Sequence, residues 1–326
     1  MKVNNQRKFH YLTGLFFLCV IFSIFIGRYP EIGFMKPDTL LTDTIAQNIF
    51  FNLRIPRVIL GLLLGMTLGA SGLVFQTVFN NPLVGSSMLG VTQGASFGAA
   101  IGIVFFNSNS WIVQFLAITL GASGLFLSVF SARKIHYGGW TLRLILAGSM
   151  ISALFGAGLT LLKYLADSRN QLHAIEFWLM GGLGSTTWRG LPIVIVIILL
   201  SLFVLWRIRW RINLLSLDNE TGLSLGVNVR RERLIVLAMA VFSGSAATSL
   251  SGIIGWISLI VPHLARRLFG ADTKDSLPAS MLIGAILVLL CDSGARTLSP
   301  VEIPLGIITS FIGVIVFVLL MGVKNK

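Results

Sequence analysis

The sequence has few charged residues. Asp, Glu, Lys and Arg make up 11% of its 326 positions, where a soluble domain has about 25%. This shortage, with 55% hydrophobic residues and a mean hydropathy of +0.87, excludes a disordered chain, a fibrous protein and an ordinary soluble enzyme. Cysteine is also scarce: Cys19 and Cys291 both lie in apolar stretches, which excludes a disulfide framework.

Acidic residues are almost absent from the apolar stretches, because the twelve Asp and Glu fall in loops or near the ends of those stretches. An acid in the middle of a bilayer costs about 2.5–3.5 kcal/mol, and such acids are typical of ion-coupled transporters. Their near absence here argues against ion-coupled transport. The sequence also lacks a G-x-x-x-x-G-K-[ST] phosphate loop, a nucleophile elbow and a His-Glu zinc helix. We expect no enzymatic activity, no cofactor and no metal site, and a transporter of this composition needs a partner that supplies energy.

What the chain has instead is a series of long apolar segments. They predict an all-α integral membrane protein with about ten transmembrane helices in one domain, residues 1–326. Residues 28–53 are mixed in polarity, which fits an outer loop with a short interfacial helix. The predicted spans are 11–27, 56–79, 88–106, 112–131, 143–165, 190–206, 233–250, 253–269, 278–295 and 303–322.

The basic residues predict an orientation. Of the 25 Lys and Arg, 17 fall in segments that this topology places inside and 8 in segments that it places outside. Because basic residues favour cytoplasmic loops, both termini are predicted to be cytoplasmic. The net charge of +13 then reflects orientation in a membrane and not nucleic-acid binding.

Glycine is abundant, with 34 residues, and it recurs at four-residue spacing on two predicted spans. Small residues let helices approach closely in lipid, so tight packing is the favoured interpretation and a hinge is the alternative. A weak inverted internal repeat is also predicted, because Ser71-Gly72, Pro82 and Gly90 recur at an offset of 180 as Ser251-Gly252, Pro262 and Gly270. The two glycine ridges are Gly61, Gly65 and Gly69, and Gly90, Gly94, Gly98 and Gly102.

Three arginines oppose the positive-inside bias: Arg54 and Arg57 before the second span, and Arg296 after the ninth. Two interpretations stay open on residue chemistry alone. The arginines could anchor lipid headgroups or pair locally, for example Arg296 with Asp292, or they could form a basic outer rim that docks an acidic protein.

The longest inner loop, residues 207–232, alternates basic residues with leucines at roughly helical spacing. It could lie on the membrane surface or insert into a groove on a cytoplasmic partner. Polar breaks interrupt two apolar segments, at Asn81-Pro82 and at Pro262-His263. Irregular backbone at membrane depth has to be buried in protein or face a wet cavity.

Taken together, these motifs resemble the iron-siderophore and cobalamin ABC importer permeases of the FecCD type. The resemblance is carried by RIPRVILGLLLGMTLGASGLVFQTVFNNPLVGSSMLGVTQGA at 54–95, by FWLMGGLGSTTW at 177–188, and by 252–313, which contains PH-x-x-R, D-x-x-A-R and E-x-P-x-G. It extends in register from about residue 40 to residue 322.

The resemblance implies a permease that pairs with a second copy, two cytoplasmic ATPase subunits and an extracytoplasmic substrate-binding protein. It implies that Arg54, Arg57 and Arg296 dock the binding protein. It implies an ATPase contact through Leu217, Glu220, Leu223, Leu225 and Gly226. The residues of its motifs that it associates with the transport path are Asn81, Pro82, Pro262, His263, Pro304 and Gly306.

Three departures from the family pattern stand out. Asp218 replaces a usual Gly in the inner loop, Trp256-Ile257-Ser258-Leu259 replaces Phe-x-Gly-Leu, and the segment from Gly313 to Phe317 lacks the usual Pro. Without that Pro the last span loses a kink point, so gating or substrate could differ.

The sequence therefore predicts a permease of a bacterial ABC importer in the cytoplasmic membrane, with a metal chelate as cargo and ferric siderophore favoured. Cobalamin, haem or molybdate and tungstate are alternatives within the family. A stand-alone channel or an ion-coupled carrier is the more distant alternative.

Overall fold

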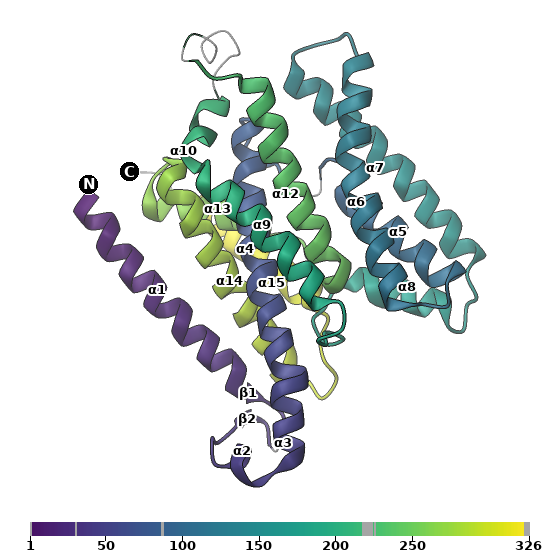
Figure 1. Cartoon of the computed structure of the whole chain (residues 1–326), viewed down its shortest axis with the longest axis vertical. Coiled ribbons are helices and arrows are strands. Elements are labelled where there is room, and N and C mark those ends of the chain that lie inside the picture. Colours follow the sequence, from purple (N-terminus) through teal and green to yellow (C-terminus); the bar gives the residue numbers. More distant parts are fainter. Residues whose placement is uncertain (1, 30, 86–87, 217–223, 225, 323–326) are drawn as a thin grey trace.

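The computed structural model describes residues 2–29, 31–85, 88–216, 224 and 226–322. Figure 1 shows a bundle of helices with a small cap at one end. The cap consists of the antiparallel strands β1 (Ile26–Gly27) and β2 (Gly33–Phe34) and of the short helices α2 (Thr39–Thr42) and α3 (Thr44–Ile49). We call this the hairpin end. The first helix begins, and the last one ends, toward the opposite end (Figure 1).

Each predicted span corresponds to one long helix, which confirms the all-α fold class. The bounds agree to within a few residues for most, although the first helix begins well before the predicted span. Among the described residues the long helices are α1 (Lys2–Phe25), α4 (Ile55–Val78), α5 (Val91–Phe105), α6 (Ser110–Lys134), α7 (Trp140–Leu165), α9 (Leu191–Arg207), α12 (Val229–Ser251), α13 (Ile257–Phe269), α14 (Thr273–Thr297) and α15 (Leu305–Gly322). The shorter ones are the π-helical turn η1 (Phe50–Arg54), α8 (Gln171–Met180), α10 (Arg209–Ile212) and the 3-10 turn η2 (Asn213–Ser216).

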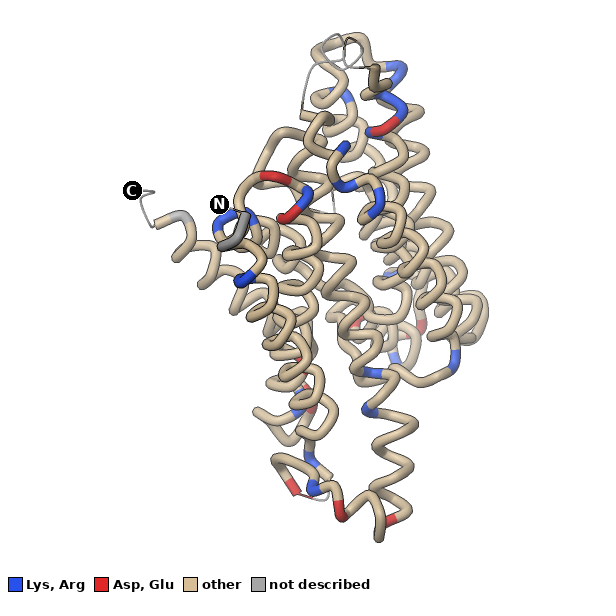
Figure 2. The backbone as a smooth tube through the Cα atoms, turned by 60° about the vertical axis from the view of Figure 1, so that its left-hand side comes forward, with Lys and Arg blue, Asp and Glu red and all other residues tan. Residues whose placement is uncertain are grey.

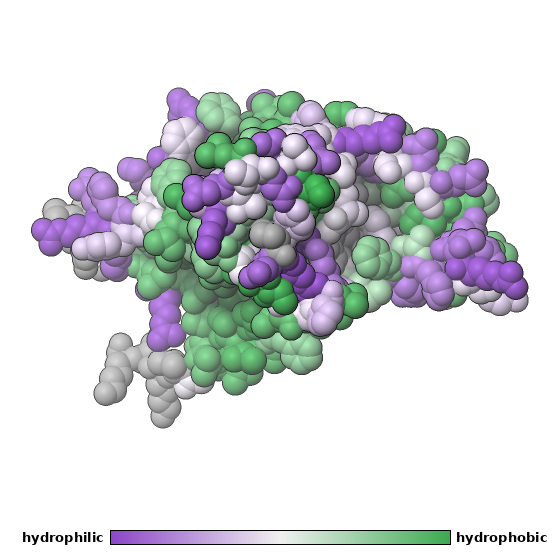
Figure 3. Space-filling model, turned by 90° about the horizontal axis from the view of Figure 1, so that it is seen from below, coloured by the Kyte–Doolittle hydropathy of each residue, from purple (hydrophilic) through white to green (hydrophobic). Residues whose placement is uncertain are grey.

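The helices have the length and polarity of membrane spans to different degrees. Six are long and apolar enough to cross a bilayer, or seven if α9 and the following α10–η2 segment, bent by 69°, count as one. Helices α5 and α15 are apolar but shorter, and α13 has 13 residues with Pro262 inside it. Charged residues gather mainly toward the two ends of the bundle (Figure 2), and seen from the hairpin end the surface mixes hydrophilic and hydrophobic residues (Figure 3).

Glycine determines how closely α4 and α14 pack. A Cβ atom built on Gly65 would collide with the Gly284 carbonyl group, and one built on Gly284 would collide with the Gly65 carbonyl oxygen. One turn further, a Cβ on Gly69 would meet the Ser280 carbonyl oxygen. The first glycine ridge is thus a packing surface, as predicted, because side chains here would force the two backbones apart.

The second ridge packs α5 against α6. Cβ atoms on Gly94 and Gly98 would collide with the carbonyl oxygens of Leu120 and Leu116. The first glycine of this ridge, Gly90, lies in the turn before α5 and is not part of the helix. It precedes α5 with φ of 72°, a left-handed conformation that glycine adopts without strain.

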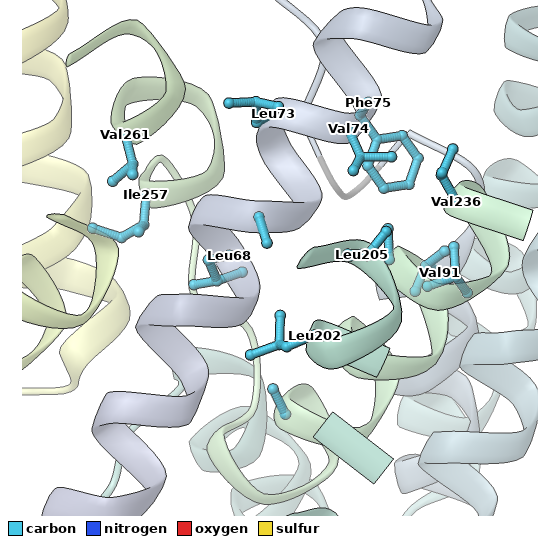
Figure 4. Close-up of a cluster of buried hydrophobic side chains, with 14 of the residues drawn as sticks. Leu68, Leu73, Val74, Phe75, Val91, Leu202, Leu205, Val236, Ile257 and Val261 are labelled. Atoms are coloured by element: carbon cyan, nitrogen blue, oxygen red, sulfur yellow. The ribbon is translucent and has the colours of Figure 1, made fainter. Parts of the chain in front are cut away.

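The core lies around α4, most of which is buried. Leu68, Leu73, Val74 and Phe75 of α4 face side chains from α5, α9, α12 and α13 (Figure 4). Helix α1 contrasts with α4, because only 11% of the residues in its apolar stretch are buried. It packs mainly on α14.

The helix pairings repeat along the chain. Helix α4 packs on α14 and α12 packs on α6, while α5 contacts α6 and α7 as α13 contacts α14 and α15. This pattern relates α4–α7 to α12–α15, as the repeat predicts. The residue matches at an offset of 180 do not mark equivalent positions, because Gly90 precedes a helix whereas Gly270 ends one, and Pro82 lies in a turn whereas Pro262 is helical.

Candidate functional site

The three singled-out arginines meet at the hairpin end. Arg54 ends η1, Arg57 lies in the first turn of α4, and Arg296 lies in the last turn of α14. With Asp292 and Glu302 they form what we call the hairpin-end network, which comes from three separate parts of the chain and bonds to the end of α1 and the hairpin.

Arg57 holds two carboxylates. Its Nε and Nη2 atoms donate to Asp292 Oδ1 at 3.0 and 2.9 Å, and its Nη1 atom donates to both carboxylate oxygens of Glu302 at 2.9 and 3.0 Å. The side chain of Asp292 is 1% exposed, whereas that of Glu302 is 47% exposed. Arg57 therefore has one carboxylate partner inside the protein and one at the surface.

Arg296 shares the inner carboxylate and also holds the end of α1. Its Nε lies 3.1 Å from Asp292 Oδ2, and its Nη atoms donate to the carbonyl oxygens of Ser23 and Ile26 at 2.9 and 3.1 Å. Asp292 thus lies between two guanidinium groups, and the local pairing of Arg296 with Asp292 is observed. Charge-assisted bonds of this kind are the strong ones, since each buried charge has an opposite charge in contact.

Arg54 satisfies the backbone where α1 ends. Its guanidinium group donates to the carbonyl oxygens of Phe25 at 2.8 Å and Tyr29 at 2.9 Å. The last carbonyl groups of a helix have no partner within it, so Arg54 completes the C-terminus of α1. Gly27 leaves room for it, because a Cβ there would lie 2.8 Å from Arg54 Cζ.

The hairpin loop is fixed by a further bond. The Tyr29 hydroxyl donates to Asp43 Oδ2 at 2.5 Å, and Asp43 Oδ1 accepts from the backbone N–H of Ile45 at the start of α3. These bonds favour the ionised form and hold the pKa of the Asp43 carboxyl below its usual value.

The structure places the predicted docking arginines inside the protein. Arg54, Arg57 and Arg296 are 5%, 8% and 5% exposed. In this arrangement their charges are directed at intramolecular partners, so contact with another protein would require a bond to open. The bond to the half-exposed Glu302 is the one nearest the surface. A docking role for these arginines stays a prediction.

The two polar breaks, Asn81-Pro82 and Pro262-His263, lie together near the C-terminal end of α4, away from the hairpin end. The half-buried His263, in α13, has its Nε2 atom 3.0 Å from the carbonyl oxygen of Pro82. Asn81 folds the turn, because its Oδ1 atom accepts from Leu83 N at 2.9 Å. Gln76 Nε2 in addition donates to the Leu259 carbonyl oxygen at 3.0 Å.

Pro304 and Gly306 lie where α15 begins. A Cβ on Gly306 would collide with the Met180 carbonyl oxygen, so this glycine brings α15 against the end of α8. Beside it runs an apolar groove of about 670 Å³ between α8, the start of α13 and α15, which we call the α15 groove.

Two of the departures from the family pattern are neighbours in space. Trp256 adopts φ of 66°, which is unusual for a bulky residue, and its ring centroid lies 6.3 Å from that of Phe317. A Cβ on Gly313 would collide with the Trp256 side chain. Trp256, which replaces the usual Phe, thus packs against Gly313 and Phe317, which flank the position of the missing Pro, beside the α15 groove.

Most of the predicted ATPase contact lies outside the described residues: Leu217, Glu220, Leu223, Leu225 and the departure Asp218. Gly226 is described, exposed and left-handed with φ of 75°. The start of the loop is anchored to α14, because Asn213 Oδ1 accepts from Thr273 N at 2.9 Å and Asn213 Nδ2 donates to Asp272 at 2.7 Å.

Sequence reasoning missed two features. It did not foresee that Glu302 joins Arg57, although both stand in motifs that it singled out. It also missed a group of arginines at the end opposite the hairpin, contributed by α6, α7 and α12, although all of them were counted as inner basic residues. In the part of the chain that the structure describes, no three His, Cys, Asp or Glu side chains form a group that could hold a metal ion.

Comparisons with known proteins agree with this architecture. Residues 15–322 match the FecCD transport family. The chain is 38% identical to the molybdate import system permease protein MolB of Haemophilus influenzae, over 97% of this chain and 96% of that protein. It is 37% identical to the hemin transport system permease protein HmuU of Yersinia pestis, over 83% of this chain and 82% of that protein. A solved structure described as "an inward-facing conformation of a putative metal-chelate type ABC transporter" has a TM-score of 0.89 at 36% identity, covering 97% of this chain and 99% of that one.

Proposed function

Because the chain belongs to the FecCD transport family of ABC transporter permeases, we propose that it carries a metal chelate across the membrane, with ferric siderophore as the favoured cargo. The observation that supports this most is the similarity to the metal-chelate type transporter, at a TM-score of 0.89 over 97% of the chain. Relatives named for hemin and for Fe(3+) dicitrate transport, at 37% and 32% identity, support the same class of cargo.

Molybdate is the second candidate, and tungstate shares its chemistry. It is supported by the 38% identity to MolB over nearly the whole of both chains. Cobalamin is a further alternative within the family.

Permeases of ABC transporters work with separate ATPase subunits and substrate-binding proteins. We infer that this chain itself performs no covalent chemistry and that two copies form the pathway. Apolar side chains on one side of α15 support the homodimer: Phe311, Ile315 and Val318 are well exposed, next to the α15 groove. ATP binding in the partner subunits would shift the pair between outward-open and inward-open states by differential affinity.

The chain is a multi-pass protein of the bacterial inner membrane. We propose that its termini are cytoplasmic and that the hairpin end is outside, as the distribution of basic residues predicts. In that orientation the loop 207–232 faces the ATPase subunits. The bonds from Asn213 to Asp272 and Thr273 support a role in coupling, since a push on this loop would reach the start of α14.

We further propose that the binding protein docks at the hairpin end, by exchanging a carboxylate of its own for Glu302 on Arg57. Glu302→Gln removes the competing charge at a half-exposed position while leaving the buried Arg57–Asp292 pair intact. Even at the value of an exposed ion pair, a few tenths to 1 kcal/mol, removing the bond from Glu302 should lower the Kd of the binding protein about two- to fivefold. The matched control is Glu176→Gln, which breaks the exposed pair with Lys163 and should leave Kd unchanged. Unchanged or weaker docking of the Glu302 variant would contradict the exchange.

Uptake into proteoliposomes tests the proposed function. The liposomes hold this chain, its ATPase and its binding protein, and the cargo is labelled ferric siderophore or labelled molybdate. We expect ATP-dependent uptake of the siderophore that requires all three components. Uptake of molybdate alone would move the chain to the second candidate, and uptake without the ATPase would support a stand-alone channel or carrier.

A further inference from the structure

A cavity at the end opposite the hairpin has an unusual concentration of positive charge. It lies where α6 ends and α7 and α12 begin, has a volume of about 410 Å³, and we call it the basic pocket. Its walls in the described part of the chain contain four arginines and no carboxylate. The lining residues are Ala132, Arg133, Trp140, Arg143, Arg230 and Arg233.

Backbone and aromatic groups position these arginines. Arg143 Nε donates to the Gly138 carbonyl oxygen at 2.8 Å, and Arg233 Nη2 donates to that of Leu215 at 2.7 Å. The guanidinium group of Arg230 lies over the Trp140 ring, 5.8 Å from its centroid. Carbonyl oxygens and a ring face fix the direction of a guanidinium group without neutralising its charge, so the contacts of Arg143 and Arg230 leave these two guanidinium groups positive.

One helix N-terminus adds to the positive potential. Helix α7 begins at Trp140 after Gly139, which has no side chain to cap it, whereas at the start of α12 the Asn228 side chain accepts from the N–H of Arg231. The first N–H groups of a helix lack partners within it and favour an anion. Glu232 in the first turn of α12 forms an ion pair with Arg211, whose Nη1 atom lies 2.9 Å from Glu232 Oε1.

A second cavity adjoins the basic pocket and has an apolar wall. It has a volume of about 450 Å³, shares Arg133 and Arg230 with the basic pocket, and continues along α12; we call it the α12 groove. Its apolar wall consists of half-buried residues one turn apart: Leu234, Ile235, Ala238 and Met239. A cationic site that opens into an apolar channel along a membrane helix matches an amphiphile with an anionic head.

We propose that the basic pocket and the α12 groove bind an anionic phospholipid. The phosphate group lies between Arg133 and Arg230, and an acyl chain lies along Ala238 and Met239. Basic pockets between membrane helices are suited to such headgroups, which are enriched in the cytoplasmic leaflet. This site goes beyond the transport function and rests on the proposed orientation, in which this end of the bundle is cytoplasmic. Free phosphate shares the headgroup chemistry, and the apolar wall favours the lipid as its source.

The test counts phosphatidylglycerol bound to the purified full chain by native mass spectrometry, with titration of the lipid in detergent. Arg133→Gln with Arg230→Gln should weaken binding about ten- to thirtyfold, at close to a factor of five per arginine near a membrane surface. The matched control is Arg7→Gln with Arg267→Gln, two exposed arginines toward the same end, with the same change of charge. That control should leave the affinity unchanged. Equal lipid binding by both double variants would overturn the proposal.

A second variant distinguishes the sources of the phosphate. Ala238→Phe fills the α12 groove and should weaken lipid binding while circular dichroism and thermal unfolding stay those of the unchanged chain. If Ala238→Phe binds the lipid normally and inorganic phosphate competes with it at equal concentration, the site is one for soluble anions and the lipid assignment is wrong. If the Arg133 and Arg230 variants lose the ATPase subunit but retain the lipid, the surface is a protein contact and the proposal fails.

Discussion

Asp292→Ala should lower the free energy of unfolding by about 3–5 kcal/mol, the range found when one partner of a buried ion pair is removed. Asp292 is the shared carboxylate between Arg57 and Arg296, and its side chain is 1% exposed. Its removal leaves two buried guanidinium groups facing each other. Glu302 can compensate only for Arg57, because it bonds the Nη1 atom of that residue.

Chemical unfolding of the purified chain in detergent measures this effect. The matched control is Glu176→Ala, which removes the carboxylate of the exposed Lys163–Glu176 pair and should cost at most about 1 kcal/mol. Asp292→Asn keeps the shape of the side chain and one acceptor oxygen. Its loss of unfolding free energy should therefore lie between those of Asp292→Ala and Glu176→Ala. If Asp292→Ala and Glu176→Ala destabilise the chain equally, the network does not stabilise the hairpin end.

Gly65→Ala should destabilise the chain by about 1–3 kcal/mol, as inserting atoms into a tightly packed interface does. The added Cβ would collide with the backbone carbonyl group of Gly284, which cannot move aside like the end of a flexible side chain. Gly284→Ala should have a similar effect, because its Cβ would meet the Gly65 carbonyl oxygen across the same contact. The two substitutions together should cost less than their sum, since either one separates the helices.

Gly244→Ala is the control for this prediction. Gly244 is buried within α12, yet a Cβ there would meet no atom within 4 Å apart from its chain neighbours and the backbone of its own helix. Alanine is favoured over glycine in a helix by up to about 1 kcal/mol, so this variant should be neutral or more stable. The same unfolding measurement compares them. A loss at Gly65 no larger than at Gly244 would show that α4 and α14 separate without penalty.

The helices could be predicted because their signal is local. Runs of about 20 apolar residues define spans, and the glycine spacing of Gly61, Gly65 and Gly69 indicates a packing face. Helix α13 could be predicted for the same reason, although it is short, with 13 residues, and contains Pro262. The bend of 69° between α9 and α10 has no comparable signal in the sequence.

The hairpin-end network could be predicted only in part. Arg296 and Asp292 stand four residues apart on one helix, so their pairing follows from helical geometry. Arg57 meets the same carboxylate across 235 residues of sequence, and that contact depends on how α4 packs on α14. Position near the end of a span suggests that an arginine is exposed. Burial depends on the end of α1 and the neighbouring hairpin, whose carbonyl groups accept hydrogen bonds from Arg54 and Arg296.

Helix α1 has polar and aromatic contacts near both of its ends. Near its start the ring of Phe9 lies 4.4 Å from that of Phe269 and Asn5 donates to Asp275 at 2.9 Å; at its finish Arg296 donates to Ser23 across 273 residues of sequence. These partners belong to α13 and α14, which the ribosome makes late. At about 5–20 residues per second, roughly 15–55 s separate the synthesis of Ser23 from that of Arg296. Helix α1 must therefore wait in the membrane for the partners that α13 and α14 supply; until then lipid, the insertion machinery and the hairpin with Arg54, which is made soon after α1, are its neighbours.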